Sequence, residues 1–117
     1  MTRFFYTLDE SRTMVLKQDD MELLERKFAM YVILAVEKHP MSTKTEIMRL
    51  DNGNEKTKFN RIQELIAAGL IHHVETETGA TRIDLTPEGK AIAAKLKTLR
   101  LALIKSTRNN QDPDDTE

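Results

Sequence analysis

Polar side chains that could bind nucleic acid recur at helical spacing in residues 54–69. On a helix that turns by about 100° per residue, the apolar residues of this segment fall on one side. They are Phe59, Ile62, Leu65 and Ile66. The opposite side carries Lys56, Thr57, Asn60, Arg61 and Glu64. Cations, amides and hydroxyls are the groups that contact phosphates and base edges, so we expect an amphipathic helix whose polar side is free for a partner.

A short helix and a turn precede this segment. Thr43 and Glu46 have the spacing of a capping box, and apolar residues follow them. Residues 51–54 then read as a turn, in which Asn52 or Asn54 could cap the next helix. Two helices joined by a tight, glycine-containing turn predict a helix-turn-helix.

A β-hairpin is predicted after Gly69, a residue that suits a helix C-terminus. Residues 70–77 and 80–85 have strand character and are separated by Thr78-Gly79, a turn signal. Thr86-Pro87 then marks the start of a helix, with a threonine cap and proline in the first helical position.

Two other helices carry more apolar surface than one core requires. The first begins at Asp19 or Asp20 and ends near His39, before Pro40. From Phe28 onward it is apolar almost all round, so we expect it to be covered on two sides, with another subunit as the second cover. The last helix, 87–106, has a leucine-rich seam for a partner helix. The expected dimer-interface residues are Tyr31, Leu34, Ile92, Leu96, Leu99 and Leu103.

The two ends of the chain have weaker secondary-structure patterns than its centre. Residues 1–18 fit either a weak hairpin or an irregular arm or short helix on a partner subunit. Residues 107–117 are polar and acidic and should form a disordered tail. The fold class expected for the 117 residues is one mainly α domain with a small antiparallel β-hairpin.

Composition restricts the function. A net charge of −1, with 39% hydrophobic and 32% charged residues, fits a soluble globular protein, cytoplasmic by default. There is no signal peptide pattern and no apolar run long enough to cross a membrane. Residues 43–105 hold 11 lysines and arginines against 8 acidic residues, a balance of +3. Any nucleic-acid binding would therefore depend on placed contacts rather than on a broad positive field.

The sequence contains few residues in patterns typical of an active site, a cofactor site or a metal site. The chain has no cysteine, no glycine-rich phosphate loop and no Ser-His-Asp grouping in a structural context, so we expect no enzyme and no cofactor. His72, His73 and Glu75 invite a metal interpretation, but adjacent histidines on a strand point to opposite faces. His73 and Glu75 alone are too few ligands for a typical site, so we predict one packed and one exposed histidine and no metal.

Three stretches of the chain together resemble the winged-helix transcriptional regulators of prokaryotes, in particular compact MarR- and PadR-like proteins. They are TKTEIMRLDNGNEKTKFNRIQELIAAGLI, the short hairpin after it, and LTPEGKAIAAKL. The resemblance covers residues 20–104 and implies a winged-helix domain at 19–86 and a dimerisation helix at 87–106. In such proteins the helix equivalent to 54–69 enters the DNA major groove and the hairpin, or wing, touches the DNA backbone or minor groove.

The resemblance also implies a set of DNA contacts. Lys56, Thr57, Asn60 and Arg61 would face the DNA, with Lys44 and Thr45 near a phosphate. Arg82 is the only cation of the wing segment 75–84, which also holds three acidic residues. Either this wing touches DNA little, or Arg82 alone makes its contact, or the wing serves another partner.

The expected function is sequence-specific binding of double-stranded DNA by a homodimeric transcriptional regulator. The alternatives are a winged-helix protein-interaction module and a weakly specific architectural DNA-binding protein. Methionine and phenylalanine side chains of the first and third helices could line a cavity for a small-molecule effector at a dimer interface, although ordinary core packing explains them as well.

Overall fold

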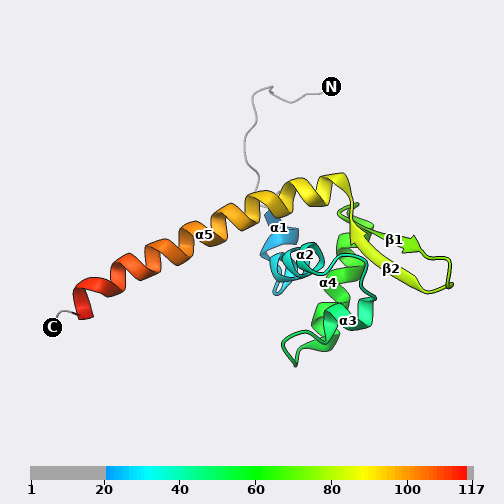
Figure 1. Cartoon of the computed structure of the whole chain (residues 1–117), viewed down its shortest axis with the longest axis horizontal. Helices are drawn as coiled ribbons and strands as arrows, with labels where there is room; N and C mark the ends of the chain where they lie inside the picture. Colours follow the sequence, from blue (N-terminus) through cyan, green and yellow to red (C-terminus); the bar gives the residue numbers. More distant parts are fainter. Residues whose placement is uncertain (1–20, 116–117) are drawn as a thin grey trace, which may run out of the picture.

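The computed structural model describes residues 21–115, with side chains for residues 21–108. Five helices and two strands follow one another in this part of the chain (Figure 1). They are α1 (Glu22–Glu25), α2 (Ala29–Lys38), α3 (Lys44–Met48), α4 (Glu55–Ala67), β1 (Ile71–Glu75), β2 (Thr81–Leu85) and α5 (Pro87–Asp115). The predicted arm or hairpin of residues 1–18 lies outside the described residues.

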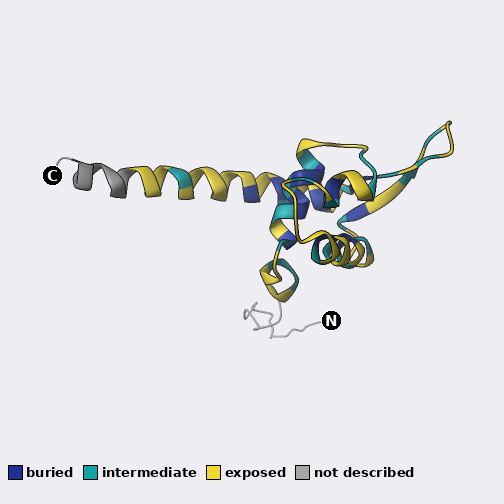
Figure 2. Cartoon of the chain, turned by 90° about the horizontal axis from the view of Figure 1, so that it is seen from below, coloured by how far each residue is buried: buried dark blue, intermediate teal, exposed yellow. Residues whose placement is uncertain are grey.

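Helix α2 forms the centre of the core. It contacts α4, β2 and the beginning of α5, and its buried residues occur on more than one side (Figure 2). The core cluster is aliphatic: Val32, Ile33, Ala35, Val36, Ile47, Ile62, Leu65, Ile71, Ile83, Leu85, Ala93 and Leu96. The all-round apolar character of α2 is therefore satisfied largely within one chain rather than by another subunit.

The first predicted helix is broken into two, so the prediction of one continuous helix to His39 was wrong. The break lies at residues 26–28, where Arg26 is extended and Phe28 has φ of 70°, in the left-handed region. A non-glycine residue rarely adopts this conformation. Here the Phe28 ring packs edge-on against Tyr31, with ring centroids 5.9 Å apart. The predicted end of the helix before Pro40 is confirmed, because α2 stops at Lys38.

Helices α3 and α4 form the predicted helix-turn-helix. The Thr43 hydroxyl accepts a hydrogen bond from the Glu46 N–H, and the Glu46 carboxylate accepts one from the Thr43 N–H, which confirms the capping box. Residues 51–54 form the turn, all with positive φ. Asn54 is the N-cap residue of α4, but its side chain makes no capping hydrogen bond. Backbone geometry rather than an asparagine cap therefore starts α4.

The predicted hairpin is confirmed. Strands β1 and β2 pair antiparallel, with Ile71 opposite Leu85 and Glu75 opposite Thr81. Ser42, just before α3, forms an isolated bridge with Ile83, and the Ile83 N–H donates to the Ser42 carbonyl at 2.8 Å. This bridge fixes the hairpin beside the start of the helix-turn-helix.

Helix α5 starts as the sequence predicts. The Thr86 hydroxyl accepts from the Gly89 N–H at 3.1 Å, and it donates to the Gly69 carbonyl at 2.6 Å. Gly89 is buried where α5 passes the preceding chain: a Cβ atom at this position would lie 2.1 Å from the Leu70 carbonyl oxygen. The helix then runs to Asp115, beyond the expected end at residue 106, so residues 107–115 are helical where a disordered tail was predicted.

A helix-turn-helix followed by a two-stranded antiparallel hairpin and a long final helix is a winged helix-turn-helix. This is the fold class that the sequence predicted. Within the described residues, no helix combines the length and the apolar character needed to cross a membrane.

Candidate nucleic-acid interface

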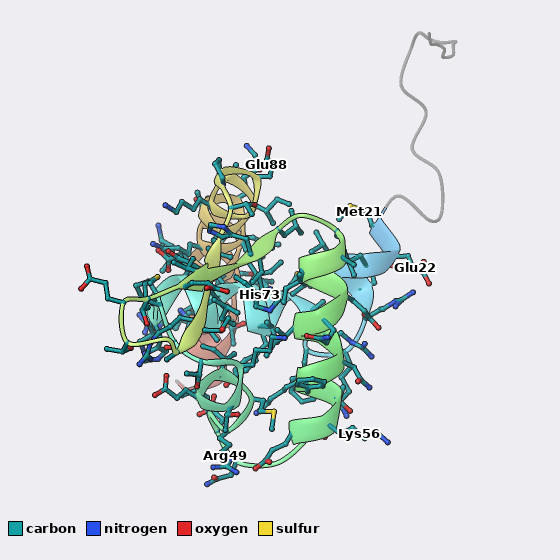
Figure 3. The ribbon with its side chains drawn as sticks, turned by 90° about the vertical axis from the view of Figure 1, so that its right-hand side faces the viewer. Met21, Glu22, Arg49, Lys56, His73 and Glu88 are labelled. Atoms are coloured by element: carbon teal, nitrogen blue, oxygen red, sulfur yellow. The ribbon has the colours of Figure 1, made fainter. Side chains whose placement is uncertain are left out.

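The outward side of α4 carries a row of polar side chains. Lys56, Asn60 and Gln63 are exposed and recur at the spacing of one helix face. Lys56 lies in the first turn of α4 and points away from the body, at the end of the molecule that also carries Arg49 (Figure 3). Thr57, predicted to share this face, is half-buried. Of the four predicted α4 contacts, Lys56 and Asn60 are thus the two that are exposed.

The inward side of α4 differs from the predicted one in two residues. Lys58 is buried with 2% of its surface exposed, beside Ile62 and Leu65. Phe59, which was expected on the apolar side, is 38% exposed. Helix α4 is therefore rotated slightly about its axis relative to the predicted orientation. The stem of Lys58 packs in the core, and the Phe59 ring lies at its edge.

Lys44 of α3 lies against the outer side of α4. Its Nζ donates to Gln63 Oε1 at 2.7 Å and lies 5.8 Å from the centroid of the Phe59 ring. With its oxygen accepting from Lys44, Gln63 can offer a partner the N–H groups of its amide. Thr45, the other predicted residue of α3, is exposed. Gln63 was missed from the sequence, although its spacing of three from Asn60 places it on the same face.

The Arg61 side chain is hydrogen-bonded to other residues of its own chain. Its Nε donates to the Lys27 carbonyl at 3.0 Å and its Nη1 to Glu64 Oε2 at 2.8 Å. Arg26 lies 3.0 Å from the other oxygen of Glu64, and hydrogen bonds to Glu22 and Glu64 raise the pKa of the Arg26 guanidinium. These contacts hold the break between α1 and α2 against α4. They give Arg61 a structural role, and its contact with DNA stays a prediction.

The wing presents acidic rather than basic groups. Glu75 and Glu77 are exposed at its end. Arg82 is half-buried and turned back toward α3, with its Nη1 3.4 Å from the Met41 carbonyl oxygen, to which it donates, and 3.7 Å from Glu46 Oε1. Arg82 therefore contacts the body in this arrangement, and its contact with DNA also stays a prediction.

The histidine pair of β1 is not arranged as predicted. His72 and His73 are both exposed, whereas one of them was expected to pack. The hairpin contributes Ile71, Ile83 and Leu85 to the core, which leaves both imidazoles outside it. Among the described side chains, no three histidine or acidic residues come together in a way that could hold a metal ion.

The expected dimer-interface residues divide into two groups. Tyr31, Leu34 and Ile92 are partly buried against this chain's own core, and Leu96 belongs to that core. Leu99 and Leu103 are 53% and 61% exposed on the part of α5 that extends beyond the body (Figure 2). Leu101, which the seam did not include, is also 59% exposed.

A hollow of about 590 Å³ lies between α2, the α3–α4 turn and α5. Its lining combines apolar residues such as Leu34 with charged ones such as Lys97 and Arg100, and includes no methionine or phenylalanine. The expected effector cavity of methionine and phenylalanine side chains is thus not this hollow, and a small-molecule effector stays a prediction.

Comparison with known proteins establishes the fold. No protein-family model matches this chain, and no curated protein matches it significantly in sequence. Its structure is similar to that of a possible HxlR family transcriptional factor from Thermoplasma volcanium GSS1, with a TM-score of 0.67 and 20% sequence identity over 81% of this chain and 89% of that one. It is also similar to Streptococcus pneumoniae FabT, crystallised in complex with DNA, with a TM-score of 0.63 and 19% identity over 84% of this chain and 74% of that one.

Proposed function

We propose that this protein binds specific double-stranded DNA sequences as a homodimeric transcriptional regulator, with α4 in the major groove. The observation that carries the proposal is the uncovered polar side of α4, where Lys56, Asn60 and Gln63 are exposed in a row. The similarity in fold to a transcriptional factor and to a protein crystallised with DNA supports it. The MarR- and PadR-like regulators remain the groups to which we would assign the chain, on the strength of its sequence stretches.

Each outward residue of α4 has a chemistry suited to DNA. An asparagine or glutamine can pair with adenine through two hydrogen bonds, and lysine commonly binds phosphate or guanine. The exposed ring of Phe59 could contact a thymine methyl group at the edge of the same surface. Lys44 and Thr45 lie next to this surface on α3 and could reach a phosphate.

The homodimer would be formed by the distal part of α5, where Leu99 and Leu103 are exposed. A second copy of α5 would cover these leucines and bring two α4 helices to one face of DNA. The half-sites would then lie about 34 Å apart on a pseudo-palindromic sequence.

One observation favours a different function. The exposed Glu75 and Glu77 at the end of the wing would repel the phosphate backbone, and Arg82 is turned back toward Glu46. A wing of this charge suits a basic protein surface, so a winged-helix protein-interaction module is our second candidate.

The test is an anisotropy titration of labelled random and genomic DNA pools at low and moderate salt. The wild type is compared with a Lys56→Ala/Asn60→Ala variant. A Lys95→Ala/Thr98→Ala variant, altered at exposed positions of α5, removes the same charge and serves as a matched control. We expect salt-sensitive binding, with each phosphate contact contributing a log–log slope of about −0.9. The α4 variant should bind about tenfold more weakly or worse while it stays folded, and the control should bind like the wild type.

The other outcomes discriminate between the candidates. Absence of wild-type binding at low salt would refute the proposal and favour the protein-interaction module. Equal binding by the α4 variant would remove DNA contact from α4. Equal competition by random and genomic DNA would indicate the weakly specific architectural role instead.

A further inference from the structure

Lys58 occupies a position where a lysine is unexpected. It lies on the inward side of α4, with 2% of its surface exposed, and neighbours Ile62 and Leu65 along that side. Burying an ammonium group is unfavourable unless it is paired or hydrogen-bonded, and fully buried lysines are rare. An aliphatic side chain would fill this position without that penalty. The ammonium group must therefore make contacts that a hydrocarbon could not.

Two kinds of contact compensate the buried charge. Lys58 Nζ donates a hydrogen bond to the carbonyl of Leu50, the last residue before the turn between α3 and α4. The same Nζ lies 5.0 Å from the centroid of the Tyr31 ring and 5.5 Å from that of Phe28. Both distances are within the range of cation–π attraction. Lys58 thus joins α4 to the end of α3 and to the start of α2.

The turn that Lys58 holds has an unusual backbone. Asp51, Asn52, Gly53 and Asn54 have φ values of 58°, 39°, 94° and 58°, so four successive residues lie in the left-handed region. Asp, Asn and Gly adopt this conformation at least cost, but usually as single residues rather than four in succession. Lys58 binds the carbonyl on one side of this turn, and the Tyr31 hydroxyl donates to Asp51 Oδ2 at 2.6 Å within it.

We infer that Lys58 is a positioning residue for DNA binding, which fixes the start of α4 so that Lys56 and Asn60 meet the major groove together. This inference rests on the proposed function. Lys58 touches no DNA itself, because its side chain is buried beneath the outer surface of α4. It acts through the Leu50 carbonyl and the turn at residues 51–54, whose geometry sets the position of the first turn of α4.

The variant that tests this role is Lys58→Met, which keeps the length and the apolar stem but removes the ammonium group. Replacing a buried charge by an apolar side chain of similar size is often neutral for stability. We therefore expect a urea midpoint close to that of the wild type. A role in packing alone predicts unchanged DNA binding by the folded variant, whereas a positioning role predicts weaker binding. Lys95→Met, at an exposed position of α5, controls for the loss of one positive charge.

The salt dependence separates positioning from direct contact. If Lys58→Met displaces the start of α4, several contacts weaken together. The dissociation constant should rise by about tenfold or more, and the log–log salt slope should fall by more than the value of about 0.9 that one phosphate contact contributes. Lys56→Ala, in contrast, should reduce the slope by about one contact. A Lys58→Met protein that is folded and binds like the wild type would overturn the inference.

A second readout needs no DNA. Amide hydrogen exchange in residues 50–58 should accelerate in Lys58→Met, because the Leu50 carbonyl and the turn lose their anchor. If the wild type binds no DNA, the proposed function fails, and unchanged exchange would then overturn the role of Lys58 as well. If Lys58→Met does not fold, Tyr31→Phe, which deletes only the hydroxyl on Asp51, should change exchange and binding in the same direction by less. Wild-type behaviour of Tyr31→Phe would in that case overturn the inference.

Discussion

Helices α4 and α5 each leave a long side uncovered, and the two sides have opposite chemistry. The outward side of α4 carries Lys56, Asn60 and Gln63, whereas the distal part of α5 exposes Leu99 and Leu103. Hydrogen-bonding side chains suit a wet and charged partner such as DNA. Exposed leucines suit a dry contact between helices. Under the proposed function, the two uncovered sides would bind different partners, DNA at α4 and a second copy of the chain at α5.

The contrast continues within α5 itself. Ala93 and Leu96 of its proximal part are buried in the core of the same chain, while Leu99 and Leu103 continue the same spacing outside it (Figure 2). One leucine seam thus serves an intramolecular contact first and is free for an intermolecular one further on.

Gly89→Ala should have the largest effect, because it disturbs the attachment of α5 to the body. A Cβ atom would lie 2.1 Å from the Leu70 carbonyl oxygen, which also accepts the Thr86 N–H. Overpacking against backbone cannot be relieved by a rotamer change, so we expect a loss of about 3 kcal/mol or more in the free energy of unfolding. Urea denaturation measures it.

Ala91→Gly is the control for this prediction. Helix propensity alone favours alanine over glycine by about 1 kcal/mol, so the exposed Ala91→Gly should destabilise by about that amount. On propensity alone Gly89→Ala would then stabilise the protein. A more stable Gly89→Ala variant would show that α5 does not pass as close to the Leu70 carbonyl as the structure indicates.

Leu99→Lys combined with Leu103→Lys should affect association rather than folding. Both side chains are more than half exposed, so the stability of the single chain should change little. Two charges in an apolar contact should raise the dimer dissociation constant by about tenfold or more, measured by sedimentation equilibrium. Leu96→Ala should instead affect folding rather than association, because Leu96 lies in the core, with a loss of about 2–3 kcal/mol in the free energy of unfolding. Thr98→Lys, off this seam, should leave the dimer intact; if it dissociates the dimer equally, the seam is not the interface.

Patterns that depend on local chemistry predicted this fold well. The Thr43–Glu46 capping box, the turn before α4, the hairpin and the Thr86 cap are decided by nearby residues, and all of them are present in the structure. The break at Phe28 could not be predicted in the same way. The left-handed conformation is unfavourable for a phenylalanine. The Phe28 ring contacts Tyr31, which is close in the sequence, and Lys58, which is thirty residues away and could not be placed beside it from the sequence.

The candidate site could be predicted only in part, because its burial pattern depends on residues that are distant in the sequence. Periodicity found the polar side of α4, including Lys56 and Asn60, but it could not decide the rotation of the helix to within one residue. Lys58 reads as a surface lysine until its neighbours are known, and Arg61 reads as a free cation until Lys27 and Glu64 are placed beside it. The seam of α5 likewise does not reveal that Leu96 packs within its own chain.

Titration of Tyr31 should give the smallest effect and concerns the anchor of α4. Burial, and then the hydrogen bond to Asp51, raise the pKa of Tyr31 to about 12. The unfolded chain has a tyrosine pKa of about 10, so the folded state favours the protonated phenol. The stability that Tyr31 contributes is therefore fully present below pH 10 and is lost as the pH rises through about 12.

Tyr31→Phe isolates this contribution. At pH 8 the variant should be less stable than the wild type by about 1 kcal/mol, the usual net value of one hydrogen bond, and the difference should shrink above pH 10. Because the chain has two tyrosines, a Tyr6→Phe background lets the absorbance of tyrosinate report Tyr31 alone. A midpoint near 10 in that titration would mean that the Tyr31 phenol is neither shielded from water nor held by Asp51. The turn before α4 would then depend on Lys58 alone, and the polar side of α4 would be anchored at one point rather than two.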